Sequence, residues 1–328
     1  MTWTAALRLS VALAALVGCS SPPATRRATT PTTPTTGPAP ATTLRPATTV
    51  GPATTVGPAT TAPCGWRATP AATYQHVIWI WMENHTWSQV LGDPKAAPFE
   101  TSLAARCATA TAFRNIGSPS LPNYIGATSG ATHGIADDAP PASHPLTVDN
   151  IFRQVRAAGG RERSYQEAMA TPCQLGPGGR YAVKHNPAAY YVGGEDRAAC
   201  GADDVPFAQL GADLASGHLP TFSFVTPDLC HDTHDCSVRT GDDWLAAELP
   251  PILASPEYRQ GNTVVFVVWD EYTPVPAIVL GPSVRPGTVV TQAFDHYALL
   301  RATEELLGLP GRLGAGERAI DLRPLFNL

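Results

Sequence analysis

Two continuous apolar stretches interrupt the mixed pattern of hydrophobic and polar residues along the chain. Residues 76–82 and 263–269 consist almost entirely of β-branched, aromatic and other large apolar side chains. Such runs are typical of strands that are buried on both faces in the middle of an α/β sheet. The first run ends in Glu83 and Asn84, and the second ends in Asp270 and Glu271. We therefore expect two central strands, each followed by a pair of oxygen donors.

Helical and strand-like patterns alternate through the rest of the chain from Cys64 to Leu328. Helices are expected over residues 98–108, 123–129, 148–158, 207–215, 242–253 and 295–307. Shorter strands are expected over residues 111–116, 163–167, 221–225 and 277–280. This alternation predicts a three-layer α/β sandwich with a largely parallel central sheet and helices on both faces. The length suits one domain, over residues 64–328.

The polar residues after the two apolar runs predict a metal site. If the two strands are parallel neighbours, Glu83, Asn84, Asp270 and Glu271 meet at the edge of the sheet where open α/β folds bind ligands. Hard oxygen donors suit one divalent cation, and Ca²⁺, Mg²⁺, Mn²⁺ and Zn²⁺ remain open as its identity. The alternative is a pair of core strands that simply end in polar turns. Because both runs end in adjacent donors, the metal site is favoured.

The first residues have the pattern of a secretion signal. Arg8 precedes a short apolar run over residues 9–17, which is too short to span a membrane as a mature helix. The run closes on Leu16, Val17, Gly18 and Cys19, which is similar to the lipobox of bacterial lipoproteins. We predict a signal peptide over residues 1–18 and lipidation of Cys19. An ordinary signal peptide cut a few residues away is the alternative.

A low-complexity segment separates the predicted signal from the domain. Residues 19–63 are rich in Thr, Pro, Ala and Gly, contain no acidic or aromatic residue, and repeat the sequence VGPATT at 50–55 and 56–61. Such a composition cannot bury a core, and Pro-rich chain is extended. We predict a disordered stalk that holds the domain away from the outer face of the bacterial cell membrane, to which the lipid would anchor it.

Charge and cysteine content narrow the class of protein further. From Cys64 onward the chain has 18 Lys and Arg against 27 Asp and Glu, a formal charge of about −9. An acidic domain argues against nucleic-acid binding, which needs basic surface. Six cysteines remain after Cys19, and an even number in an exported domain suggests disulfides. Pairing of sequence neighbours is expected: Cys64–Cys107, Cys173–Cys200 and Cys230–Cys236.

Ser120 lies in a stiff segment that can open a helix. Pro119 and Pro122 flank it, and proline is favoured in the first turn of a helix. A hydroxyl at a helix N-terminus meets free N–H groups and a positive dipole end, which suits a phosphate group. The segment by itself fits a simple helix cap equally well. A nearby metal ion could activate the hydroxyl as a nucleophile.

An ordered set of motifs identifies a family. The chain resembles the phosphoesterase family of bacterial acid phosphatases and phosphatidylcholine-type phospholipases C, over about residues 77–309. The motifs are MENH at 82–85, PSLPNY at 119–124, KHNP at 184–187, PDLCHDTHDC at 227–236, GDDWL at 241–245 and WDE at 269–271. The resemblance implies a fold related to alkaline phosphatases and sulfatases, and a single metal ion.

The resemblance also implies roles for individual residues. The metal ligands would be Glu83 and Asn84 together with the late acidic pair Asp270 and Glu271. Ser120 would be the nucleophile, and Asn123 of the same motif would contact the substrate. His185 and His234 are the candidates for binding phosphoryl oxygens or protonating the leaving group. Some members of the family have two Asp at the end of the late strand, whereas Glu271 here reaches further.

These features together predict a metal-dependent phosphoesterase at the cell surface that acts through Ser120. The PSLPNY motif is closer to the acid phosphatase branch, so a phosphomonoester is the expected substrate. A phospholipase C that cleaves phospholipid head groups is the second candidate. A surface lipoprotein that kept the fold and lost turnover is the third.

Overall fold

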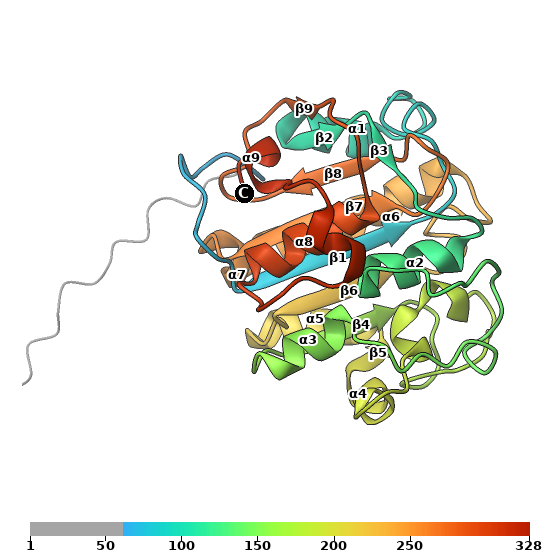
Figure 1. The fold of residues 1–328 in the computed structure, drawn as a ribbon. Helices are drawn as coiled ribbons and strands as arrows, with labels where there is room; N and C mark the ends of the chain where they lie inside the picture. The colour runs from blue at the N-terminus through green and yellow to red at the C-terminus, as the bar shows by residue number, and fades with distance from the viewer. Residues whose placement is uncertain (1–61) are drawn as a thin grey trace, which may run out of the picture. The chain divides into compact units, whose positions relative to one another are not determined.

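The computed structural model describes residues 62–328, and an eight-stranded sheet forms its centre (Figure 1). The strands follow the order β5-β4-β6-β1-β7-β8-β2-β9. Their bounds are β1 His76–Met82, β2 Ala108–Ala110, β4 Glu162–Gln166, β5 Asp204–Pro206, β6 Phe222–Thr226, β7 Thr263–Trp269, β8 Ala277–Leu280 and β9 Thr288–Val290. Only β8 runs against its neighbours β7 and β2 within this described sheet. The predicted largely parallel sheet is confirmed.

Helices cover both faces of the sheet, as Figure 1 shows. One layer contains α2 (Ser120–Ser129), α3 (Ile151–Ala157) and α8 (His296–Leu306), with α2 in contact with the other two. The opposite layer contains α1 (Pro98–Arg106), α5 (Ala208–Ser216), α6 (Val238–Ala254) and α7 (Pro256–Arg259), which pack around α6. The three-layer architecture is therefore the one that the alternation of patterns predicts.

Several short elements complete the described chain. They are α4 Asp196–Asp203, α9 Arg323–Phe326 and the 3₁₀ helices η1 Val183–His185, η2 Pro187–Tyr190 and η3 Gly314–Arg318. A separate two-stranded sheet pairs β3 Phe113–Arg114 with β10 Phe294–Asp295. The strand expected over residues 111–116 is thus shorter and lies outside the main sheet. Helix α2 starts earlier than expected because Pro122 fits within a first helical turn.

The core lies around the two central strands. All seven residues of β7 and six of the seven residues of β1 are buried, as expected for strands covered on both faces. Trp79, Trp81 and Trp269 are fully buried. The ring of Trp81 lies 4.7 Å from that of Tyr124 and 4.8 Å from that of His296, measured between centroids. These contacts join the sheet to α2 and α8.

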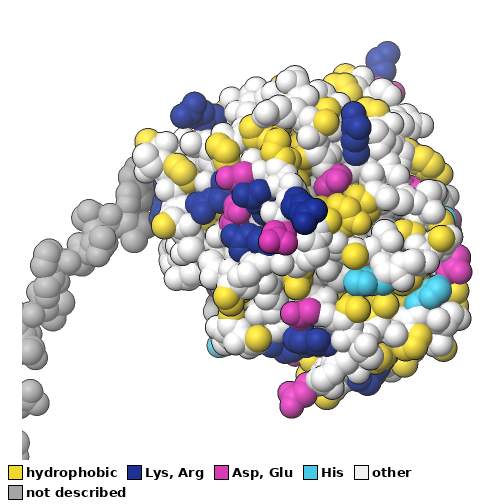
Figure 2. Space-filling model, in the orientation of Figure 1, with side chains coloured by type: hydrophobic (Ala, Val, Ile, Leu, Met, Phe, Trp, Pro, Cys, Tyr) yellow, Lys and Arg dark blue, Asp and Glu magenta, His cyan; other side chains and the backbone are white. Residues whose placement is uncertain are grey.

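Disulfides and ion pairs fasten the surface segments to this core. The predicted pairs Cys64–Cys107, Cys173–Cys200 and Cys230–Cys236 are all present. On the face shown in Figure 2, basic and acidic side chains lie next to one another near α8, where Arg301 and Arg312 both pair with Glu305, at 2.9 and 3.4 Å. The Arg301–Glu305 pair lies within α8, and the Arg312–Glu305 pair joins α8 to the segment that follows it.

The predicted signal peptide, Cys19 and nearly all of the predicted stalk lie outside the described residues. Among residues 62–328, no helix has both the length and the apolar character needed to cross a membrane.

Candidate active site

The ends of β1 and β7 bring two sequence-predicted carboxylates together. The strands pair in parallel with Met82 opposite Trp269, so Glu83 and Asp270 leave the sheet side by side. The backbone N–H of Asn84 donates to Asp270 Oδ1 at 3.0 Å. Asn84 adopts a positive φ of 54°, a conformation that Asn tolerates better than most residues. The turn after β1 therefore folds against the end of β7 at the carboxyl edge of the sheet.

Ser120 reaches the same place from the first turn of α2. Its Oγ donates to Glu83 Oε2 at 3.1 Å, and the residue is 1% exposed. The predicted nucleophile and a predicted metal ligand are thus in direct contact at a helix N-terminus, whose positive dipole end suits an anion. Leu121 N–H is already used, because it donates to Asp138 Oδ1 at 3.0 Å.

Asn123 holds the loop that leads into this helix. Its Oδ1 accepts from the backbone N–H groups of Ile116 and Gly117, both at 2.9 Å. Its Nδ2 donates to the carbonyl oxygen of Gly117 at 3.0 Å, and the residue is fully buried. These bonds position Ser120 through the loop, and a contact between Asn123 and the substrate stays a prediction.

A second layer of groups surrounds the Glu83 carboxylate. The Tyr124 hydroxyl donates to Glu83 Oε1, and His185 Nε2 lies 3.2 Å from the same oxygen. The rings of Tyr124 and His185 stack at a centroid distance of 5.3 Å. On its other side, His185 Nδ1 lies 3.2 Å from Asp232 Oδ2. The imidazole is therefore held between two carboxylates on a stacked aromatic ring.

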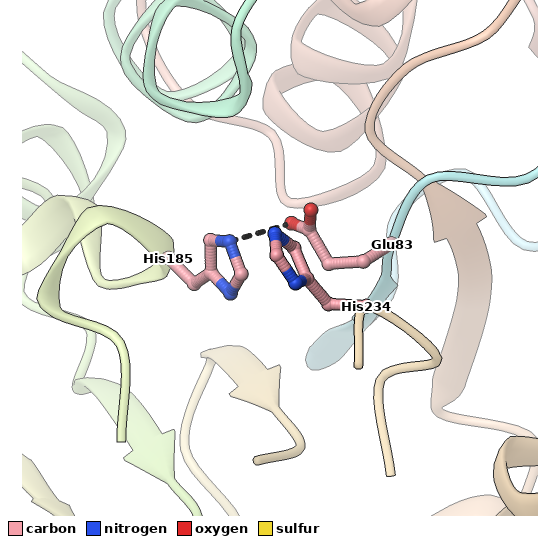
Figure 3. Close-up of side chains that lie close together, drawn as sticks. All are labelled: Glu83, His185 and His234. Atoms are coloured by element: carbon pink, nitrogen blue, oxygen red, sulfur yellow. Dashed lines mark ion pairs between the residues drawn. The ribbon is translucent and has the colours of Figure 1, made fainter. Parts of the chain in front are cut away.

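His234 enters the site from the loop that the Cys230–Cys236 disulfide closes. Figure 3 shows His185 and His234 approaching Glu83 from different segments of the chain. One ligand atom from each of these three residues lies within 4.8 Å of the others. His231, the other histidine of the loop, instead has its Nδ1 2.9 Å from Glu167 Oε2, so it does not join the group.

Burial changes the charge that these groups carry. Burial, followed by the Asp270 and Asp232 carboxylates, raises the pKa of Glu83 well above its usual value. Burial raises the pKa of Asp270 to about 7 and that of Asp232 to about 8. Burial lowers the pKa of His185 well below its usual value, which favours the neutral imidazole. A bound cation would relieve this concentration of buried carboxylates.

Unpartnered buried atoms provide a direct test of whether these residues fit a metal ion. Among the described residues, no hydrogen-bond partner exists for Asn84 Oδ1, Asp270 Oδ2 or Glu271 Oε2. Asp232 Oδ2 and His185 Nε2 also lack a hydrogen bond and have only the ion-pair contacts of 3.2 Å described above. Buried polar atoms normally have a hydrogen-bond partner, so several atoms without one at the same site need an explanation. Carboxylate and amide oxygens with an imidazole nitrogen form a donor set for a divalent cation. The residues present therefore fit one.

Glu271 follows Asp270 directly and is buried like it. It is 5% exposed, and burial raises the pKa of its carboxyl while a hydrogen bond from Ser118 lowers it. The charges of Lys184 and His234 also act on it. Glu271 thus lies at the site, near the loop before α2, and its role as a direct ligand stays a prediction.

Four residues at the site were not identified from the sequence as site residues. Tyr124 follows Ser120 by four positions, and this spacing places both on one face of a helix, so a signal was available. Asp232 lies inside the motif that supplied His234. Lys184 precedes His185, and its Nζ lies 2.9 Å from Asp138 Oδ2 and 3.3 Å from His234 Nε2. Asp138 lies in a loop without a recognisable motif and comes near the site only in the folded chain, so the sequence around it gave no such signal.

Solved structures with this architecture define the fold class. A protein in the alkaline phosphatase superfamily from Vibrio parahaemolyticus matches with a TM-score of 0.51 and 13% identity, covering 74% of this chain and 69% of that one. The lipoteichoic acid synthase LtaP from Listeria monocytogenes matches with a TM-score of 0.53 and 12% identity, covering 76% of each chain. The fold is therefore that of the alkaline phosphatase superfamily, as the motifs implied.

Sequence comparison identifies the family within this fold. The sequence model of the Phosphoesterase family matches residues 93–274. A phosphatidylinositol-3-phosphatase of Mycobacterium tuberculosis is 31% identical over 256 residues, covering 75% of this chain and 81% of that protein. A probable acid phosphatase of Kluyveromyces lactis is 27% identical, covering 73% of this chain and 59% of that protein, which is less than two thirds of its length.

The chain belongs to the Phosphoesterase family and is a hydrolase that acts on phosphoric ester bonds. The resemblance stated from the ordered motifs is thereby confirmed, together with the fold and the reaction class that it implied.

Proposed function

We propose that this chain is a metal-dependent phosphomonoesterase that uses Ser120 as its nucleophile. The observation that carries the proposal is the hydrogen bond from Ser120 Oγ to Glu83 Oε2. Around this bond lie buried side-chain atoms that could bind a metal ion and that lack a hydrogen-bond partner among the described residues. A structural serine cap would need neither the three neighbouring carboxylates nor the orphaned atoms around them. The names of the relatives, all phosphatases, support a phosphomonoester rather than a diester as the substrate.

Glu83, Asn84 and Asp270 would hold the metal ion, with Asp232 or His185 completing the set. When bound, a divalent cation supplies positive charge for the phosphoryl oxygens and lowers the pKa of a nearby hydroxyl group. Pro119 and Pro122 have no backbone N–H and that of Leu121 binds Asp138, so the Ser120 N–H is the one in the first turn of α2 that orients the phosphoryl group. Ser120 Oγ then attacks phosphorus in line as its proton passes to Glu83 Oε2, and the bond to the leaving oxygen breaks.

His234 is the better placed of the two predicted histidines to protonate the leaving oxygen. Its Nδ1 lies 2.7 Å from Asp235 Oδ1, and its side chain is 26% exposed at the mouth of the site. A carboxylate behind an imidazole fixes the orientation of the ring. His185 is fully enclosed and favours the neutral form, so it suits binding better than proton donation. Water finally cleaves the phosphoserine and releases phosphate.

The test combines the variant Ser120→Ala with metal analysis of the purified protein. We expect kcat on p-nitrophenyl phosphate to fall by at least about 10³-fold while the metal content stays unchanged. Ser129→Ala, at the other end of α2, is the matched control and should retain activity. Full activity of Ser120→Ala would refute the nucleophile. Preferential hydrolysis of p-nitrophenylphosphorylcholine would instead favour the phospholipase C, and inactivity on every phosphoester with added divalent metals would favour a non-catalytic lipoprotein.

We also propose that the protein is exported and anchored by a lipid on Cys19 to the outer face of the cell membrane. The short apolar run that ends at Gly18 and Cys19 supports this location. Disulfides in the folded domain support an oxidising compartment.

A further inference from the structure

A cavity lies directly beside the candidate active site, and apart from His234 its lining residues take no part in the chemistry proposed above. Its volume is about 380 Å³, within the range of small-molecule pockets. Apolar side chains form most of its wall, namely Pro140, Pro177, Ala182, Val183 and Leu229. An apolar surface of this kind, although it is partly open to solvent, favours an alkyl or aryl group over a polyol.

One end of the cavity is shared with the active site. Asp138, Lys184 and His234 line it there. The rings of His234 and His185 lie 5.6 Å apart, and His185 contacts Glu83. The cavity therefore opens at the histidine proposed to protonate the leaving oxygen, so a group that occupies it would be attached to that oxygen.

The wall of the cavity is preformed. Gly178 and Tyr181 exchange two backbone hydrogen bonds, of 3.1 and 2.9 Å, and the Tyr181 hydroxyl donates to the carbonyl oxygen of Gln174 at 2.8 Å. Leu229 N–H donates to the carbonyl oxygen of Arg180 at 3.1 Å. A pocket that is already ordered binds its ligand without an added ordering cost.

We propose that this cavity binds the alkyl or aryl part of the alcohol that leaves from the phosphomonoester. The substrate class is then a phosphate ester of an alcohol with an apolar group next to the ester oxygen. This inference rests on the proposed function. Lys184 at the mouth is paired with Asp138 at 2.9 Å, which leaves no unpaired carboxylate there to attract a cationic leaving group among the described lining residues.

A series of straight-chain alkyl phosphates, from methyl to hexyl phosphate, tests the proposal. Their alcohols have nearly equal reactivity as leaving groups, so kcat/KM reports binding of the chain. For the wild-type protein we expect kcat/KM to rise by roughly two- to fourfold per added methylene until the cavity is filled. A value independent of chain length would overturn the subsite, whereas failure to hydrolyse any member would overturn the proposed function instead.

Two variants test whether this cavity causes the dependence of kcat/KM on chain length. Ala182→Phe fills the cavity and Leu229→Asp makes its wall polar, and each should lower kcat/KM for hexyl phosphate about tenfold or more. Both variants should hydrolyse methyl phosphate at a rate within about twofold of that of the wild type, which would show that the active site is intact. Leu175→Asp, at an exposed leucine that does not line the cavity, is the matched control. A full rise with chain length in Ala182→Phe would overturn the assignment of this cavity.

Discussion

Asp232 connects three parts of the site through one residue. Its carbonyl oxygen accepts from Glu83 N–H at 2.7 Å, and its Oδ1 accepts from His234 N–H at 2.8 Å. Its Oδ2 lies 3.2 Å from His185 Nδ1. A carboxylate in this position fixes the tautomer and orientation of the imidazole.

We expect Asp232→Asn to lower kcat/KM by about 10- to 100-fold, because the amide keeps the contact to the His234 N–H but places an NH₂ group where the carboxyl Oδ2 faces His185 Nδ1. Steady-state kinetics and thermal unfolding together measure this effect, and the melting temperature should change little. Asp243→Asn, an exposed residue paired with Arg239, is the control. Wild-type kinetics in Asp232→Asn would show that this carboxylate has no part in the site.

Asp204 is a buried carboxyl that affects stability rather than chemistry. Its Oδ2 accepts from Asn186 Nδ2 at 2.8 Å, while its Oδ1 has no partner among the described residues. Burial raises its pKa to about 7. Because the folded state favours the protonated form, the associated stability is present below the unfolded pKa and is lost as the pH rises toward 7.

Asp204→Asn should remove this pH dependence. Between about pH 5 and pH 7, the wild type should lose roughly 1.4 kcal/mol of unfolding free energy per pH unit relative to the variant. Urea unfolding of both proteins at several pH values measures the difference. Parallel pH profiles for the two proteins would mean that Asp204 is ionised in the folded state throughout this range.

At the scale of elements, the long buried strands were the most predictable feature. Residues 76–82 and 263–269 carry enough apolar side chains to specify strands, and their polar ends specified where Glu83 and Asp270 would lie. The direction of β8 and the pairing of β2 with β9 were not predictable, because strands of three or four residues contain no signal for direction.

The parts of the site that sequence reasoning missed depend on tertiary structure. Asp138 belongs to a loop and reaches Lys184 and the start of α2 only after the chain folds. The choice between His231 and His234 likewise depends on how their loop turns, since both flank Asp232 in the same motif. Local sequence patterns do not predict which residues of distant segments come into contact.

Removal of one disulfide should mainly lower the stability of the protein, whereas removal of another should mainly lower its activity. The Cys230–Cys236 bond has a sequence separation of 6, whereas Cys64–Cys107 has one of 43. Chain-entropy arguments assign about 2 kcal/mol to the shorter loop and about 4 kcal/mol to the longer one. The short loop, however, contains Asp232 and His234.

We expect the double variant Cys230→Ser with Cys236→Ser to lose at least about tenfold in kcat/KM, because the histidine is no longer held. Cys64→Ser with Cys107→Ser should unfold at a lower temperature but keep its activity while folded. Differential scanning calorimetry and kinetics on both variants measure the contrast. Equal activity losses in the two would contradict a specific role for the short loop.

At the scale of the whole molecule, the proposed attachment to a membrane would depend on the N-terminal segment. The chain from Cys64 onward has a formal charge of about −9, so an anionic bilayer would not attract it. Cys19→Ala should therefore move the protein from the membrane fraction to the soluble fraction, with Ser20→Ala as the control. Retention of Cys19→Ala in the membrane fraction would refute lipid anchoring through this residue.

The packing of Trp81 against Tyr124 and His296 has an optical consequence. Tyr124 donates to the Glu83 carboxylate, and His296 Nε2 donates to the carbonyl oxygen of Asp270 at 2.7 Å. The Trp81 indole therefore packs against one residue that binds Glu83 and one that binds Asp270, the two acidic residues that directly follow the central strands. Its fluorescence should change when a cation or an oxyanion enters between them, so the unlabelled protein contains its own reporter of ligand binding.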